Sequence, residues 1–182
     1  MDIVKHIQPH TENLHNVCRR LSTEQLKNLK LAVIEFYYLL PGFENVISRH
    51  IQIPVTKDQL STDISNGNLE SYQTAIEKSN AEIDEYAADY EEPEALDIFI
   101  LEALDNAVAD TNTPASVAGL LIGVINTLDY YENFSDEPGY WSNLLEQELT
   151  FQNEILIAAG KEAFSDTSVY QKQYQDVDFA VL

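Results

Sequence analysis

Apolar residues recur along this chain at steps of three and four, and this spacing restricts its possible folds more than any other feature. Between residues 22 and 40, Leu26, Leu29, Val33, Phe36 and Leu40 follow one another at steps of three, four, three and four. Such steps place an apolar stripe on one face of an α-helix, whereas a strand alternates at every second residue. Ser22 and Gln25 precede the stripe in the arrangement of a capping box, so the pattern predicts a helix over residues 23–39.

Three further helices with strong signals are predicted between residues 93 and 161. The first begins at Pro93 and runs to about residue 109; it is apolar on most faces, so we expect it at the centre of the domain. Thr113 and Pro114 predict the start of the second, which ends near residue 131. Asp136 and Pro138 predict the start of the third, over residues 137–160. Short loops between such helices are typical of an antiparallel bundle. The predicted core face of the third helix is Trp141, Leu144, Leu145, Leu149, Phe151, Gln152, Ile155, Leu156 and Ala159.

Weaker patterns predict helices in most of the remaining chain. A short helix is expected over residues 10–20, because Pro9 interrupts any helix before it. Others are expected over residues 43–51, 57–64 and 68–90, the last with a narrow stripe that includes Ile83 and Tyr86. Residues 51–55 alternate like a strand but have no partner strand, so we expect a connector.

The predicted fold class is therefore all-α: a single-domain antiparallel helical bundle of about six to eight helices over residues 1–164. Six glycines and six prolines are few for 182 residues, which argues against a many-turned β-sandwich or barrel. Residues 165–182 are expected to form a polar C-terminal tail, either docked or disordered.

The net charge of −21 is concentrated in the later part of the chain. Residues 1–60 carry seven Lys or Arg and six Asp or Glu, whereas the other 122 residues carry three basic and 25 acidic ones. A chain so poor in Lys and Arg predicts weak affinity for phosphates, so we expect no nucleic-acid partner and no membrane partner. A basic protein is the partner that this charge favours.

Cys18 is the single cysteine, so no internal disulfide is possible and a reducing, cytoplasmic location is expected. Residues 1–9 hold no apolar core of signal-peptide length. The apolar run over residues 115–128 is too short to span a bilayer and contains Ser116 and Asn126. Gly119 and Gly123 in this run predict close packing against a neighbouring helix.

No residue pattern typical of a catalytic, cofactor-binding or metal site stands out. Cys18 has His15 three residues before it, but no motif supplies an orienting acid or an oxyanion hole. His6 and His10 have helical spacing yet flank Pro9, and they do not follow the spacing of zinc sites. The chain has a single Glu-x-x-His, from Glu12 to His15, and so lacks the two such motifs of di-iron bundles; its acidic run lacks the central glycine of a calcium loop. We therefore predict a non-enzyme without a cofactor or metal.

Two groups of residues are candidates for binding a partner. Charge runs are usually solvated faces, and the aromatic group has two interpretations: the edge of the core, or an exposed binding patch. Some of the acidity also has a local reason, since carboxylates near Pro93 meet the positive end of a helix dipole. The acidic group is Glu82, Asp84, Glu85, Asp89, Glu91 and Glu92, and the aromatic group is Tyr130, Tyr131, Phe134, Tyr140 and Trp141.

Three stretches resemble a bacterial family of all-helical proteins typified by YjaG. Residues 39–43, Leu-Leu-Pro-Gly-Phe, look like the break that follows this family's first long helix. Residues 90–103, with Pro-Glu-Ala-Leu-Asp at 93–97, are similar to the start of its central helix, although the family's cysteine is replaced by Ile98 or Phe99. Residues 148–154 are similar to its late Glu…Phe-Gln-x-Glu segment. The family has no established activity, so the resemblance implies a helical fold and little about function.

The leading functional hypothesis is a non-enzymatic cytoplasmic binding protein whose acidic part engages a basic protein, as an immunity or inhibitor protein engages a basic toxin. Two alternatives stay open. One is a small-molecule binder or enzyme with a pocket between the central helices, marked by inward-facing Asn106, Asn126 or Gln152. The other is a structural homo-oligomer.

Overall fold

The computed structural model describes residues 3–83, 86, 92–109, 112–161 and 164–181. These residues form nine helices and no strand, which confirms the all-α prediction. In chain order the helices are α1 (Ile3–Cys18), α2 (Thr23–Tyr37), α3 (Phe43–Ile51), α4 (Lys57–Asn66), α5 (Glu70–Glu82), α6 (Ala95–Val108), α7 (Pro114–Phe134), α8 (Pro138–Ala159) and α9 (Val169–Tyr174). None of the helices in this described part is both long and apolar enough to cross a membrane.

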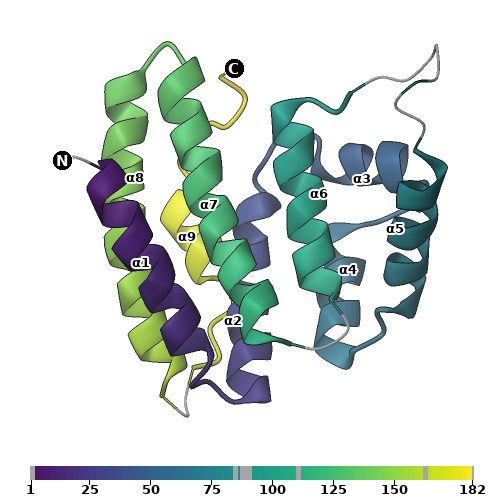
Figure 1. The fold of residues 1–182 in the computed structure, drawn as a ribbon, viewed down its shortest axis with the longest axis horizontal. Helices are drawn as coiled ribbons and strands as arrows, with labels where there is room; N and C mark the ends of the chain where they lie inside the picture. Colours follow the sequence, from purple (N-terminus) through teal and green to yellow (C-terminus); the bar gives the residue numbers. More distant parts are fainter. Residues whose placement is uncertain (1–2, 84–85, 87–91, 110–111, 162–163, 182) are drawn as a thin grey trace.

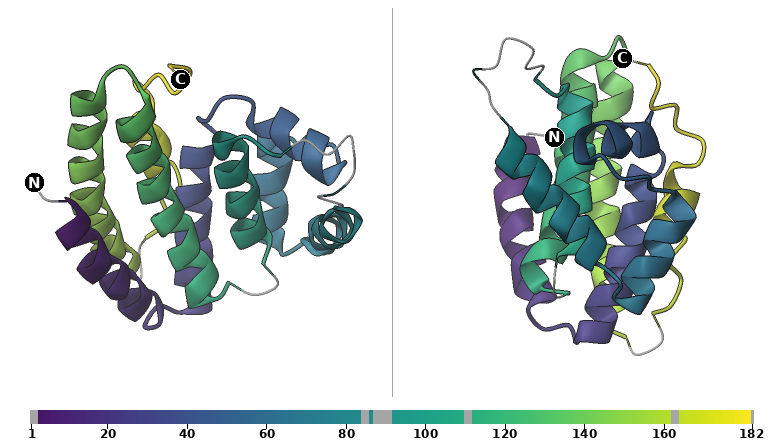
Figure 2. Two further views of the ribbon diagram at one scale, coloured as in Figure 1. Left: turned by 45° about the horizontal axis from the view of Figure 1, so that its top comes forward. Right: turned by 90° about the vertical axis from the view of Figure 1, so that its right-hand side faces the viewer.

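The long helix α7 is the hub of the bundle. It forms an antiparallel pair with α8, and α1, α2 and α6 pack around it (Figure 1). On the far side of α6 lie the shorter helices α3, α4 and α5, with α5 at the outer edge in Figure 1 and in the left view of Figure 2. The short helix α9 packs against α2, so the segment expected to be a docked or disordered tail is docked.

Local signals determine where several helices begin and end. The capping box of α2 is present: Gln25 N donates to Ser22 Oγ at 3.3 Å, and Ser22 N donates to Gln25 Oε1 at 2.8 Å. At the start of α7 the backbone N–H of Ser116 donates to Thr113 Oγ1 at 3.1 Å. Helix α4 ends at Gly67, whose φ of +75° is a left-handed conformation that favours glycine. These boundaries agree with the sequence predictions.

Three predicted boundaries were wrong. Helix α1 runs through Pro9 instead of starting after it. The lost backbone hydrogen bond is outweighed because α1 packs on α7 and α8, where Leu14 and Cys18 are fully buried. Helix α5 ends at Glu82, and Ile83 is extended and half exposed; most of the predicted helix beyond it lies outside the described residues. Pro93 precedes α6 and does not occupy its first turn, because the helix begins at Ala95.

The predicted glycine pair lies where neighbouring side chains come close to α7. The hydroxyl group of Tyr37, from α2, donates to the backbone oxygen of Leu120 at 2.7 Å. A Cβ atom at position 123 would overlap that hydroxyl, and one at position 119 would lie 2.7 Å from Oδ1 of Asn106. Gly119 and Gly123 therefore allow the close packing that their spacing predicted.

Candidate acidic binding site

The fold divides the predicted aromatic group between the core and the surface. Tyr131 and Trp141 are buried, with stacked rings whose centroids are 4.3 Å apart, and Phe179 of the C-terminal segment packs on both. Tyr130 contacts the Tyr131 ring edge-on at 6.4 Å and packs on Phe134 with ring centroids 4.6 Å apart, and Phe134 is 67% exposed. Tyr131 and Trp141 are therefore part of the core, Tyr130 lies at its edge, and Phe134 is exposed.

Tyr140, which is 44% exposed, lines a surface pocket of about 460 Å³ where α7 connects to α8. One wall comes from that connection and the start of α8. The other comes from the C-terminal segment, defined here as residues 164–181, whose end approaches the same end of the bundle in Figure 1. We call this the acidic pocket; its lining residues are Ser135, Asp136, Glu137, Tyr140, Trp141, Asp176, Asp178 and Val181.

Buried contacts hold the C-terminal wall of the acidic pocket in place. The hydroxyl group of Tyr131 donates to the backbone oxygen of Phe179 at 2.5 Å. The Phe179 ring also packs edge-on against Phe36 of α2, with ring centroids 5.4 Å apart. Asp176 and Asp178 lie just before this anchored residue, and both are exposed. The wall is therefore an ordered part of the fold, and its position depends on α2 and α7.

Four carboxyl groups of the described residues line the acidic pocket, and none of these four forms an ion pair with a described cation. After residue 60 the basic residues are Lys78, Lys161 and Lys172. Lys78 lies 3.8 Å from Glu82, and Lys172 lies 2.8 Å from Asp166, whose pKa its hydrogen bonds lower to about 2. Lys78 and Lys172 are thus engaged with other carboxylates, and none of the ion pairs between described residues includes Lys161, so the described residues leave the charge of the acidic pocket uncompensated.

Neither of the two described residues of the predicted acidic run lines this pocket. Glu82 and Glu92 are both exposed, and Glu82 lines a different pocket. Four of the predicted positions, Asp84, Glu85, Asp89 and Glu91, lie outside the described residues.

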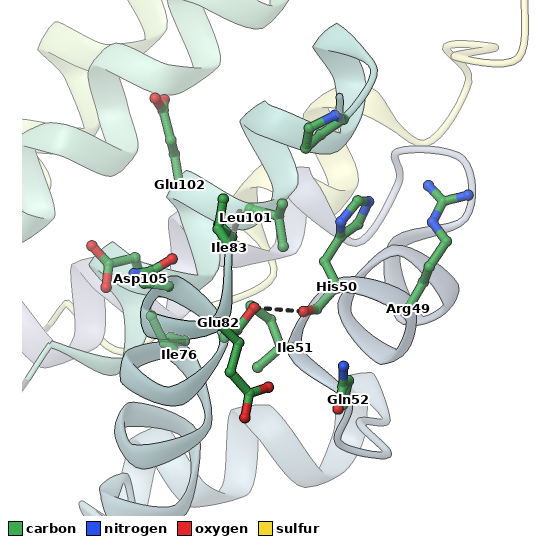
Figure 3. Close-up of a pocket in the computed structure, with 13 residues that line it drawn as sticks. Arg49, His50, Ile51, Gln52, Ile76, Glu82, Ile83, Leu101, Glu102 and Asp105 are labelled. Carbon is green, nitrogen blue, oxygen red and sulfur yellow. Dashed lines mark hydrogen bonds between the residues drawn. The ribbon is translucent and has the colours of Figure 1, made fainter. Parts of the chain in front are cut away.

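The pocket that Glu82 lines has a volume of about 430 Å³ and lies between α3, α5 and α6 (Figure 3). Figure 3 shows Glu102 and Asp105 of α6 across it from Arg49 and His50 of α3. Both basic residues instead contact the buried Asp97 at the start of α6: Arg49 Nη2 donates to Asp97 Oδ2, and His50 Nε2 lies 3.2 Å from the same oxygen. This ion pair network joins α3 to α6.

Ser79, His50 and Asp97 share the residue types of a catalytic triad but not its geometry. The hydroxyl group of Ser79 donates to the backbone oxygen of His50 at 2.7 Å, which is the dashed line in Figure 3. In a triad the serine hydroxyl would instead be hydrogen-bonded to the imidazole. The three residues therefore form structural links between α3, α5 and α6.

A buried polar network, absent from the sequence prediction, centres on Glu148 of α8. This carboxyl group is fully buried and accepts three hydrogen bonds: from Tyr170 at 2.8 Å, from Tyr174 at 2.6 Å and from Gln152 Nε2 at 2.7 Å. Burial raises the pKa of Glu148 to about 7, while the three donors act in the opposite direction. Gln152 Nε2 also donates to the Leu121 backbone oxygen, and Gln152 Oε1 lies 2.8 Å from His10 Nε2.

The polar residues that were to mark an internal binding pocket have other roles. Gln152 faces inward as expected, but all of its polar atoms have partners within the fold. Asn126 is exposed, and Asn106 Nδ2 donates to the Glu102 backbone oxygen of its own helix at 3.0 Å. Cys18 is buried, and burial raises the pKa of its thiol to about 11, which disfavours the reactive thiolate.

Sequence reasoning missed four pocket residues, Asp136, Glu137, Asp176 and Asp178, as binding candidates. Asp136 was recognised only as a helix start, and the two C-terminal aspartates lie in a segment whose docking was left open. No local pattern links them, because about forty residues separate the two pairs in the chain. Glu148 did carry a signal: it lies on the apolar stripe of α8, four residues before Gln152.

Neither the protein-family models, nor the curated proteins, nor the solved structures with which the chain was compared gave a match.

Proposed function

We propose that this protein is a non-enzymatic, cytoplasmic binding protein that engages a basic protein partner, as an immunity or inhibitor protein does, and receives a Lys or Arg side chain in the acidic pocket. The observation that carries this proposal is the convergence of four carboxyl groups, from two separate segments, on one pocket that no described cation neutralises. A cationic side chain of a partner would supply the missing charge.

The aromatic side of the acidic pocket favours a cationic side chain over a free metal ion. Within the described residues no group of three or more His, Cys, Asp or Glu is close enough to hold a metal. Tyr140 is 44% exposed at the pocket, and a guanidinium group prefers to lie over such a ring. Carboxylates beside an aromatic ring can bind both the charge and the flat face of arginine.

The charge of the later part of the chain supports the same proposal over a longer range. An excess of 22 negative charges after residue 60 attracts a basic protein during diffusional encounter. The same excess makes two copies of this chain repel each other, so it does not favour the homo-oligomer. The pocket then provides the specific contact that general attraction lacks.

The test is the binding of a fluorescently labelled hexa-arginine peptide, followed by fluorescence anisotropy at physiological ionic strength. The double variant Asp176→Asn, Asp178→Asn removes two carboxylates from the pocket, and we expect the affinity to fall on the order of tenfold. The matched control is Glu70→Gln, Glu77→Gln on α5, where both side chains are exposed and the net charge changes by the same amount.

If the two double variants lose the same affinity, the peptide responds only to overall charge and the proposed pocket is wrong. Light scattering of the protein alone provides a second check, because a stable homo-oligomer would favour the structural alternative.

A further inference from the structure

The C-terminal segment has two structural roles, and both involve its short helix α9. It forms one wall of the acidic pocket through Asp176 and Asp178, and it is fixed to the bundle through the buried side chains of Tyr170, Tyr174 and Phe179. Any change that loosens this segment would also remove half of the carboxyl groups from the pocket.

Helix α9 makes its polar contacts with the core through one carboxyl group, that of Glu148. Tyr170 donates to Glu148 Oε1 at 2.8 Å, and Tyr174 donates to Glu148 Oε2 at 2.6 Å. All three side chains are buried, so both tyrosines lose these hydrogen bonds to Glu148 if α9 leaves. Water would then reach Glu148, since α9 is the element that covers this part of α8 with the two tyrosine rings.

Among the described residues, the groups that face Glu148 supply hydrogen-bond donors but no paired cation. Tyr37 of α2 lies near enough for the Glu148 charge to raise its pKa further above the value that burial gives it. On the side of α1, His10 contacts Gln152, and it is Gln152 that donates to Glu148. From α7 the network receives only the backbone oxygen of Leu121. Lys30 of α2 is buried, but its Nζ has no hydrogen-bond partner and so none with Glu148.

Ionisation of Glu148 therefore has a different free-energy cost in the docked and undocked states of α9. Burial raises the pKa of Glu148 to about 7 when α9 is docked, whereas a solvated glutamate has a value near 4.5. A carboxyl group whose pKa is raised by docking binds more protons in the docked state. Docking is consequently most favourable at the acidic end of this range, and it weakens as the pH rises from about 4.5 to about 7.

We propose that Glu148 makes the C-terminal segment a pH-dependent wall of the acidic pocket, closed at mildly acidic pH and opening more often as the pH approaches and passes neutrality. Opening separates Asp176 and Asp178 from Asp136 and Glu137, so the pocket is complete only when α9 is docked. The link to a basic partner rests on the proposed function, but the opening of the segment does not.

Amide hydrogen exchange of the α9 region, measured by mass spectrometry from pH 5 to pH 7.5, tests the opening directly. After division by the intrinsic exchange rate at each pH, we expect the opening equilibrium to rise on the order of tenfold or more in the unmodified protein. In Glu148→Gln the rise should vanish, because an amide does not titrate. The matched control Glu154→Gln changes an exposed carboxyl group on the same helix and should keep the rise.

A second variant keeps the test decisive if Glu148→Gln does not fold. Tyr174→Phe removes one donor to the ionised carboxylate, so it should increase opening more at pH 7.5 than at pH 5. Trp141, the single tryptophan, packs against Phe179 and reports the same opening through acrylamide quenching of its fluorescence. An opening equilibrium that does not change with pH, or that changes equally in Glu148→Gln, would overturn the proposal.

These measurements contain no partner, so their result is separate from that of the peptide experiment. If α9 opens with pH but hexa-arginine binds no better than to the pocket variant, the proposed function fails and the pH-dependent wall stands. If the peptide binds through the pocket but α9 shows no pH dependence, the reverse holds.

Discussion

The hydroxyl group of Tyr37 occupies the space that a side chain at Gly123 would need. This hydroxyl donates to the Leu120 backbone oxygen at 2.7 Å, and a Cβ atom added at position 123 would overlap it. The contact joins α2 to the hub helix α7 in the fully buried core. Displacing Tyr37 would leave a buried hydroxyl without its acceptor.

We predict that Gly123→Ala lowers the free energy of unfolding by about 1–3 kcal/mol, because the Tyr37 ring must move and its hydrogen bond is lost. Urea denaturation followed by circular dichroism measures the change. Gly139→Ala is the matched control, since a Cβ at position 139, in the first turn of α8, meets no atom within 4 Å. That control should be neutral or slightly stabilising. Equal losses in both variants would contradict the packing argument.

Lys30 gives a prediction of the opposite sign. Its amine is fully buried without a hydrogen-bond partner, and burial lowers its pKa to about 8. Lys30→Met keeps the length of the side chain and removes the buried amine, so we expect it to raise the free energy of unfolding at pH 7 by about 1–3 kcal/mol. Lys27→Met, on the same helix but paired with Glu24, should change it by less than about 0.5 kcal/mol.

The advantage of Lys30→Met should depend on pH in a defined window. Below pH 8 the amine is protonated in both the folded and the unfolded chain, and its cost is constant. Between about pH 8 and pH 10.5 the folded chain loses the proton first, so the unmodified protein gains stability relative to the variant. Urea titrations at pH 7, 9 and 10 should show the difference shrinking. A difference that grows with pH would contradict the assignment.

Asp97→Asn should destabilise the contact between α3 and α6. Arg49 and His50 both contact Asp97 Oδ2, and the carboxyl group is buried at the start of α6, where a negative charge is favourable. We expect a loss of about 1–2 kcal/mol, smaller at high salt because Arg49 is largely exposed. Asp105→Asn changes an exposed carboxyl group on the same helix, and chemical denaturation should show little effect. A loss as large in Asp105→Asn would point to net charge rather than to this network.

Thr113→Ala should cost about 1 kcal/mol, because the threonine hydroxyl accepts the Ser116 N–H at the start of α7. Thermal unfolding measures it. Thr74→Ala, in the exposed middle of α5, is the control and should be neutral or stabilising, since alanine is the better helix former. If Thr113→Ala is also neutral, the cap does not contribute to the stability of the bundle.

The parts of this fold that could be predicted are those that local chemistry decides. The starts of α2 and α7 are determined within four residues, by Ser22 with Gln25 and by Thr113 with Pro114. The apolar stripes show which face of each helix is buried. The predictions at Pro9 and Ile83 were wrong because the local sequence preference was overridden. At Pro9 the packing of α1 on distant helices keeps the helix intact, and at Ile83 the apolar stripe extends past the point where α5 ends.

The candidate site was harder to predict because its parts are distant in sequence. Glu148 on an apolar stripe resembles any solvated glutamate until Tyr170 and Tyr174 supply its donors, 22 and 26 residues later. Tyr140 and Trp141 were recognised as candidates, but the aspartates opposite them come from a segment whose docking no local pattern reveals. Long-range contacts of this kind are decided by the tertiary fold.

The position of α1 has a consequence for the synthesis of the protein. Its buried residues Leu14 and Cys18 are covered by α7 and α8, which leave the ribosome about a hundred residues later. At roughly 5–20 residues per second the delay is on the order of ten seconds. During that time α1 has an apolar face without its native cover, so the nascent chain offers a binding site for chaperones that the finished protein no longer has.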